Sequence, residues 1–238
     1  MIPSVSFIIK ISETIEDSWY EGEVNVGYKD AILKPSSALR HSTELYSILI
    51  PKIGNKSVLF VYTDGGPDHR LTFSVQLVLV ALFLNLNLDL LVVGRTAPNH
   101  SWRNPVERIM SVINLGLQCV GMMRKEGSLE FEMVIKNANN LNAVREVAKE
   151  RYRDEVKTSL QLPLQLLASI TNRLELKKEL FSVFDSADDD EIEASWEAVH
   201  QMNDSITMSD TSNSTLQRKE KLQAFFDHCC QIRPYSLV

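Results

Sequence analysis

Cysteine is scarce in this chain, and long apolar runs are missing. Three cysteines occur among 238 residues and the first residues do not read as a secretory leader, so a reducing, intracellular compartment is expected. The most apolar stretch, residues 75–84, has about half the length that a helix needs to span a bilayer. The sequence therefore predicts no membrane partner.

Several signature motifs are missing as well. There is no phosphate-binding loop, no Gly-x-Ser-x-Gly segment and no dinucleotide-binding fingerprint, which disfavours the α/β phosphotransfer and hydrolase enzymes that carry them. Neither a helix-turn-helix nor a zinc finger is evident early in the chain. Sequence-specific DNA binding is therefore not supported.

Positive charge is not in excess. The formal net charge of −6 argues against a protein that coats DNA, and much of the acid excess lies at residues 185–197. A hydrophobic content of 44% is nevertheless typical of a chain that buries a real core. We expect a folded protein with a nearly neutral first half and an acidic second half.

The first half predicts an α/β fold. Residues 3–11 are rich in β-branched residues, and in residues 23–33 apolar and polar side chains alternate. Both patterns predict strands, which are expected to pair antiparallel. Residues 57–63 and 88–93 are near-continuous apolar runs, typical of strands buried on both faces. Helices are expected to start at residues 35–37, ending before a loop at 51–56, and to occupy residues 71–86 and 105–120. Alternating strands and helices imply a parallel sheet behind the antiparallel pair.

The second half is predicted to be α-helical, with helices at residues 128–148, 152–180 and 190–202. Residues 205–215 are a polar linker rich in Ser and Thr, and a short helix is expected at residues 216–230. The expected organisation is an α/β core (1–123), a helical region (124–204), the linker (205–215) and a short C-terminal helix with its tail (216–238).

Two carboxylates carry the most informative pattern. Asp64 directly follows the strand at residues 57–63, so its side chain is expected at the carboxyl edge of the sheet, where open α/β folds place their ligands. Glu107 lies in the first turn of the helix that Pro105 opens, one helix and one strand later. Two carboxylates that meet at this edge would bind a divalent cation through hard oxygen ligands, and such ions support phosphodiester cleavage.

Each carboxylate also has an ordinary structural interpretation. Asp64 begins the run Asp-Gly-Gly-Pro, which is typical of a plain turn. Glu107 in a first helical turn complements the helix dipole. Only the combination of the two positions favours a metal site.

The residues around both acids resemble a known family. NHSWRNPVER (residues 99–108) resembles the Asn-Pro-x-Glu signature that carries the last acid of Tc/mariner-like DDE transposases, and VYTDGGPDHR (residues 61–70) resembles the strand with their second acid. The chain is similar over most of its length to transposon-derived eukaryotic proteins with DGGPDH and NPxER segments. The resemblance implies a ribonuclease-H-like fold, dependence on Mg²⁺ or Mn²⁺, and DNA strand transfer, with Asp64 and Glu107 as catalytic metal ligands.

The sequence departs from this family at its start. The implied fold opens with three antiparallel strands, the first with the first catalytic Asp, but only two strands precede the first helix here. The first reads SFIIKI, and Asp30 at the end of the second is a poor substitute. We therefore expect a ribonuclease-H-like mixed sheet that lacks its first strand, which would lie upstream of Met1. No nuclease activity is expected from this chain alone.

Further side chains are candidates for contacts with DNA phosphates, because such contacts come mainly from basic residues. His69 is one candidate, with a turn-capping histidine as the alternative. The others cluster around the loop before Glu107, with an ordinary solvated loop as the alternative, and are Arg95, His100, Arg103 and Arg108. Trp102 either stacks on a base or packs the loop down. A DNA-directed protein would be nuclear.

Two other functional readings remain open. His228, Cys229 and Cys230 are metal-capable residue types, although adjacent cysteines rarely share a zinc ion. A decayed or domesticated module without enzymatic activity, which binds a protein partner through its helical half, is the alternative to a nuclease core.

Overall fold

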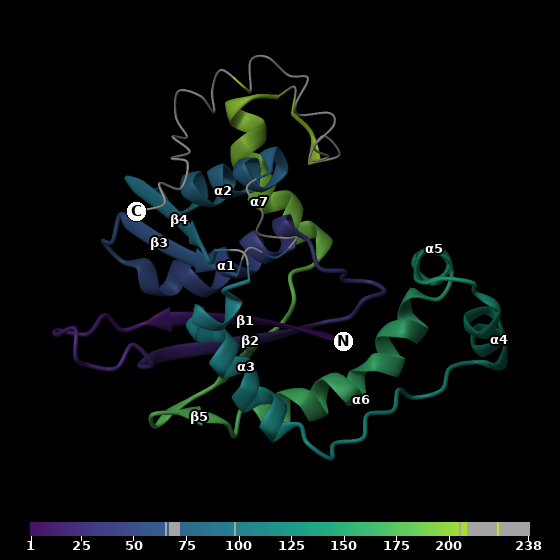
Figure 1. The fold of residues 1–238 in the computed structure, drawn as a ribbon. Helices are drawn as coiled ribbons and strands as arrows, with labels where there is room; N and C mark the ends of the chain where they lie inside the picture. The colour runs from purple at the N-terminus through teal and green to yellow at the C-terminus, as the bar shows by residue number, and fades with distance from the viewer. Residues whose placement is uncertain (65, 67–71, 98, 205, 209–222, 224–238) are drawn as a thin grey trace.

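The structure is a computed structural model that describes residues 1–238 except 65, 67–71, 98, 205, 209–222 and 224–238. It is a mixed α/β fold of small sheets and seven α-helices within the described residues, as the sequence predicts at that level (Figure 1). None of these helices is long and apolar enough to cross a membrane. The predicted linker and C-terminal helix, together with His228, Cys229 and Cys230, lie largely or wholly outside the described residues.

The first sheet begins with the expected antiparallel pair. Strand β1 (Ile2–Ile9) pairs with β2 (Gly22–Lys29), with Val5 opposite Val26. A third strand was not expected: β7 (Ser182–Phe184) adds to β2 in parallel. The sheet order is therefore β1-β2-β7, so a segment of the second half completes the sheet that the first half starts.

The predicted helix at residues 152–180 is wrong in its last third. Helix α6 (Arg153–Thr171) is followed by a hairpin of β5 (Glu175–Leu176) and β6 (Glu179–Leu180). Lys177 and Lys178 turn the chain with positive φ angles of 49° and 77°. These residues form the turn of the hairpin, where a right-handed helix could not continue, since a positive φ is costly for a side chain that carries Cβ.

The second sheet is a parallel pair, β3 (Val58–Thr63) and β4 (Leu90–Arg95), joined by helix α2 (Phe73–Asn85). The prediction of burial on both faces is wrong. One face packs on the helices, whereas the other exposes large apolar side chains: Val58, Phe60, Tyr62, Leu90 and Val92. No described element covers this second face as the helices cover the first.

Helix α1 (Ala38–Ile53) joins the two sheets. Ser37 caps it, and it continues past Pro51, where a loop was expected, because Ile53 still packs against the buried cluster around Leu49. Ile8 of β1 and Leu59 of β3 pack against the same cluster. The helix therefore lies over both sheets on one side.

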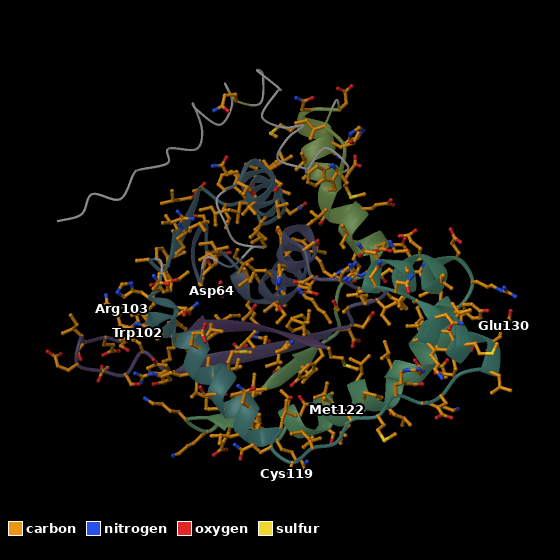
Figure 2. All side chains as sticks on the ribbon, turned by 45° about the vertical axis from the view of Figure 1, so that its right-hand side comes forward. Asp64, Trp102, Arg103, Cys119, Met122 and Glu130 are labelled. Atoms are coloured by element: carbon orange, nitrogen blue, oxygen red, sulfur yellow. The ribbon has the colours of Figure 1, made fainter. Side chains whose placement is uncertain are left out.

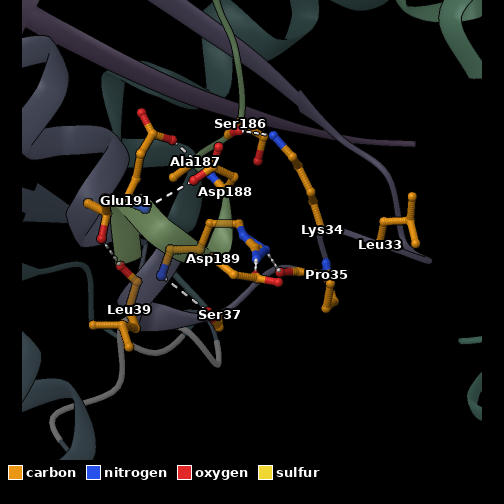
Figure 3. Close-up of polar contacts among 12 residues, drawn as sticks. Leu33, Lys34, Pro35, Ser37, Leu39, Ser186, Ala187, Asp188, Asp189 and Glu191 are labelled. Atoms are coloured by element: carbon orange, nitrogen blue, oxygen red, sulfur yellow. Dashed lines mark hydrogen bonds and ion pairs between the residues drawn. The ribbon is translucent and has the colours of Figure 1, made fainter. Parts of the chain in front are cut away.

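Helix α7 (Asp189–Met202) packs on α1 and α2 and starts with a capping box. The Asp188 side chain accepts from the Glu191 N–H at 3.0 Å, and the Asp188 N–H donates to the Glu191 carboxylate at 2.8 Å. Figure 3 shows this junction, where the Lys34 ammonium donates to the Ser186 carbonyl. The start of α7 is thus fixed to the segment that leads into α1.

The opposite face of the first sheet is covered by α3 (Pro105–Gly116) and α6. Val24 and Val26 of β2 are buried there against Ile109, Ile113 and Leu167. The predicted helix at residues 128–148 is interrupted, because Asn140 caps a new helix: α4 (Leu129–Asn137) and α5 (Leu141–Glu150) are separate. These two helices pack at the far end of α6 (Figure 1).

Candidate functional site

Asp64 follows β3 directly and is exposed. Its Oδ1 accepts the N–H of Gly66 at 2.9 Å, which closes a tight turn, and its other carboxylate oxygen accepts no hydrogen bond within the described residues. Thr96, buried at the end of β4, donates its N–H to the Thr63 carbonyl and its hydroxyl to the Asp64 carbonyl, both at 2.9 Å. The backbone of Asp64 is therefore fixed against the first residue of the loop after β4.

That loop leads into α3 and to the second acid. Its last turn is a 3₁₀ helix, η2 (Ser101–Arg103), after which the buried Asn104 caps α3 by accepting the Val106 N–H at 3.1 Å. Pro105 takes the first helical position, where its missing N–H costs nothing. Glu107 lies in the first turn and is half-buried. The local prediction of a capped helix with Glu107 in its first turn is confirmed.

The two acids thus come from neighbouring connections that follow parallel strands. Among the described residues, no hydrogen bond or ion pair joins the Asp64 and Glu107 carboxylates, and no group of three His, Cys, Asp or Glu side chains is placed to hold a metal ion. Two carboxylates alone still suit Mg²⁺, which keeps several waters and commonly takes one or two protein carboxylates besides substrate phosphates. The chemistry of the donors fits such an ion, with fewer protein ligands than a closed site has.

Two arginines close to Glu107 in the sequence, Arg103 and Arg108, stack on aromatic rings. The Arg103 guanidinium lies 5.0 Å from the centre of the Trp102 ring, whose other neighbour is His100 at 6.3 Å between ring centres. Figure 2 shows Trp102 and Arg103 on the same side of the molecule as Asp64. Trp102 is 62% exposed although it contacts two residues of its own loop, so much of its ring faces solvent.

The Arg108 guanidinium lies 5.0 Å from the centre of the Tyr20 ring. Arg95 ends β4, one residue before Thr96. His69 lies outside the described residues. The candidate side chains that lie within the described residues are called the basic loop, a name that includes the ends of β4 and α3 on either side of the loop. They are Arg95, His100, Trp102, Arg103 and Arg108.

A buried polar cluster was missed at the sequence level. Lys29, at the end of β2, is 1% exposed and lies 2.8 Å from the Glu44 carboxylate and 3.0 Å from His41 Nδ1. The opposite ring nitrogen of His41 is 3.0 Å from the Ser36 hydroxyl. The only sequence signal was the spacing of His41 and Glu44 on one helix face, since lysine is seldom buried.

No family model, no curated protein and no solved structure matches the chain. The chemistry of the residues and their positions in the fold therefore carry the functional inference alone.

Proposed function

We propose that this chain is a transposase-derived protein with an incomplete, metal-dependent nuclease core of ribonuclease-H-like type, inactive in strand transfer by itself. The observation that carries the proposal is the pair of hydrogen bonds from Thr96, because they hold the end of β3 with Asp64 against the loop that delivers Glu107. Asp64 and the loop that leads to Glu107 both follow the carboxyl ends of the parallel strands β3 and β4, the usual ligand position in such sheets.

The topology of the described elements supports the same class. An antiparallel pair precedes two parallel strands that alternate with helices, and helices cover the first sheet on both sides. The order of these elements along the chain supports the proposed fold, whereas the two pairs lie in separate sheets and β7 is an addition that the sequence did not predict.

In this proposal Asp64 and Glu107 hold Mg²⁺ or Mn²⁺ through their carboxylates, and the ion supplies charge stabilisation at a phosphodiester. The basic loop would bind the DNA backbone, because guanidinium groups match phosphate oxygens in a bidentate manner. A third protein carboxylate is missing among the described residues, so binding without turnover is expected. A DNA partner would place the protein in the nucleus.

Titration with Mn²⁺ followed by calorimetry and by the electron spin resonance of free Mn²⁺ tests the metal site. We expect one weakly bound ion, lost in Asp64→Asn and in Glu107→Gln, with Glu150→Gln on the exposed end of α5 as the matched control. Unchanged binding in the double variant would refute the site. Mg²⁺-dependent nicking of plasmid DNA that is lost in Asp64→Asn would overturn the proposed inactivity.

The second candidate function is a protein-interaction module that uses the helical half. The observation that favours it is a set of exposed apolar side chains on and before α4 and α5, with Met123 at 88% and Leu129 at 87% exposed. Met122 and Glu130 mark this region in Figure 2, far from Asp64. Absence of Mn²⁺ binding in the titration above would favour this module over the nuclease core.

A further inference from the structure

The parallel pair of β3 and β4 has one face that the described helices do not cover. Odd-numbered residues of both strands line the cavity under α1 and α2 or pack against the cluster around Leu49. Successive side chains of a strand point to opposite faces, so the even-numbered residues form the other face. We call this the outer face, and it consists of Val58, Phe60, Tyr62, Leu90, Val92 and Gly94.

The side chains of the outer face are apolar and yet largely exposed. Their exposed fractions lie between 38% and 64%, with Phe60 at the maximum. None of the six positions is charged, and the Tyr62 hydroxyl is their one polar side-chain group. A sheet face that meets water normally carries polar side chains, whereas the strands of a parallel pair are normally buried on both faces. The outer face is therefore suited to burial against another surface.

The missing charge limits which partner this face fits. Nucleic acid and anionic lipid are bound through Lys and Arg, and the outer face has neither. A strongly charged protein surface would lose its hydration here without gaining an ion pair. The partner must therefore present a flat, apolar and uncharged surface of similar size. The outer face of a second copy of this chain meets each of these conditions.

We propose that the outer faces of two copies of this chain pack together, sheet on sheet, in a two-fold symmetric dimer. With ordinary residue areas, the exposed fractions amount to roughly 450 Å² of apolar surface per copy, and functional patches of monomers are typically about 300–600 Å². Neighbouring side chains at the rim would raise the total on both copies to about 1,200 Å², where specific but weak interfaces begin. The area is therefore sufficient for a weak dimer.

The sizes of the side chains favour one arrangement of the two copies. The Phe60 and Tyr62 rings of β3 form a ridge that leans over Gly94, where an added Cβ would lie 3.5 Å and 3.3 Å from them. Leu90 and Val92 of β4 are smaller. A two-fold axis parallel to the strands places β3 of each copy over β4 of the other, so that large side chains face small ones at a sheet separation of about 10 Å.

The pairing of β3 with β4 gives the contacts expected across this axis. Phe60 is the register partner of Val92, so both lie at the same height along the sheet. Rotation about the axis brings Phe60 of one copy opposite Val92 of the other, and the reverse contact follows by symmetry. An axis across the strands would instead place β3 over β3 of the second copy, so that the two aromatic ridges would collide. The two arrangements therefore predict different neighbours for Phe60.

Sedimentation velocity of the full chain between about 1 and 200 µM tests the dimer. Divalent ions are left out, so that the outcome is independent of the proposed metal site. The mass should rise with concentration from 27.0 kDa toward twice this value. Phe60→Ala should raise the dissociation constant about tenfold, since a central aromatic side chain commonly dominates such an interface. Phe60→Lys should prevent association throughout the range, because its ammonium would be buried without a partner.

Leu129→Lys is the matched control, because Leu129 is 87% exposed on α4, away from the outer face. It should change the dissociation constant less than twofold. Since Phe60 is exposed in the single chain, Phe60→Lys should leave the urea midpoint unchanged when both proteins are diluted to about 0.1 µM, where a weak dimer is dissociated. This measurement separates a loss of association from a loss of folding.

Mixtures of variants test the arrangement of the two copies. Phe60→Lys on one copy and Val92→Glu on the other place opposite charges in contact across the proposed axis. Their equimolar mixture should associate at least tenfold more tightly than either variant alone, whereas Phe60→Lys mixed with Val92→Lys should show no recovery. The proposal is overturned if the chain sediments as a single copy throughout, which would leave the outer face to another segment of the chain or to a different protein. Equal effects of Phe60→Lys and Leu129→Lys, or equal association in the two mixtures, would overturn it as well.

Discussion

The Lys29 ammonium and the Glu44 carboxylate lie 2.8 Å apart, with both side chains nearly inaccessible to solvent. Glu44 also accepts from the Ser186 hydroxyl at 2.7 Å and from the Ala187 N–H at 3.3 Å. One buried carboxylate thus connects the end of β2, helix α1 and the segment between β7 and α7. Removal of one partner from such a pair leaves an uncompensated charge in the interior.

Lys29→Met should therefore destabilise the fold by about 3–5 kcal/mol. The free energy of unfolding from urea titration measures this loss. Lys10→Met is the matched control, because Lys10 pairs with Glu21 at 2.6 Å on the surface and its loss should change stability little. Equal effects of the two variants would contradict the structural role of the buried pair. The double variant Lys29→Met/Glu44→Leu should recover part of the loss.

Helix starts and the antiparallel pair were predictable because their signals are local. Alternation of Val24, Val26 and Tyr28 gave β2, and Asn104-Pro105 gave the start of α3. Strand β7 was not predictable, since its three residues become a strand only by pairing with β2, a contact that the sequence pattern does not contain.

The prediction that β3 and β4 are buried on both faces failed for a related reason. An apolar run shows that a strand tolerates burial, but the elements that cover it are set by the whole fold. At the site, the turn at Asp64 and the first-turn position of Glu107 were local and predictable. The hydrogen bond from the Thr96 hydroxyl to the Asp64 carbonyl and the exposure of the Trp102 ring depend on how the segments after β3 and β4 are placed in the fold. The sequence alone did not reveal that placement.

Gly27 should resist substitution. It lies opposite Phe184 in the β2–β7 register, and a Cβ at this position would overlap the Phe184 ring. Gly27→Ala should therefore displace β7 and cost about 1–3 kcal/mol of stability. Gly121→Ala is the control, since a Cβ there meets nothing within 4 Å. Thermal unfolding of both variants measures the difference, and an unshifted midpoint for Gly27→Ala would show that β7 does not pack on β2 as described.

Asn104 should stabilise the turn that carries Glu107. Its side chain accepts the Val106 N–H at 3.1 Å and is 6% exposed. Asn104→Ala should cost about 1 kcal/mol, the usual effect of losing an N-cap, whereas Asn104→Asp should retain most of the stability. Urea unfolding measures both. If Mn²⁺ binding at Asp64 and Glu107 occurs, Asn104→Ala should weaken it as well, and unchanged stability would contradict the capping role.

The loss of stability at acidic pH should depend on Glu132. The Arg124 guanidinium and then the Gly127 N–H lower the pKa of Glu132 from 4.5 to about 2. A carboxyl with a lowered pKa in the folded state stabilises the protein above pH 4.5, and this contribution is lost as the pH falls through about 2. Glu132→Gln should therefore flatten the decline in urea midpoint across this range, and Glu150→Gln should not. A decline as steep in Glu132→Gln as in the unmodified protein would refute the assignment.

The basic loop should bind single-stranded DNA through Arg103 and the exposed Trp102 ring. Each phosphate contact that is lost lowers the slope of log affinity against log salt concentration by roughly 0.7 for a single strand. Arg103→Gln should reduce the slope by about this amount, whereas Lys149→Gln on α5 should leave it unchanged.

Quenching of tryptophan fluorescence by oligothymidine should fall in Trp102→Ala, because bases stack on exposed aromatic rings. Since Arg103 already lies against Trp102, the two substitutions should be less than additive. Equal salt slopes for Arg103→Gln and Lys149→Gln would leave the loop without a role in DNA binding.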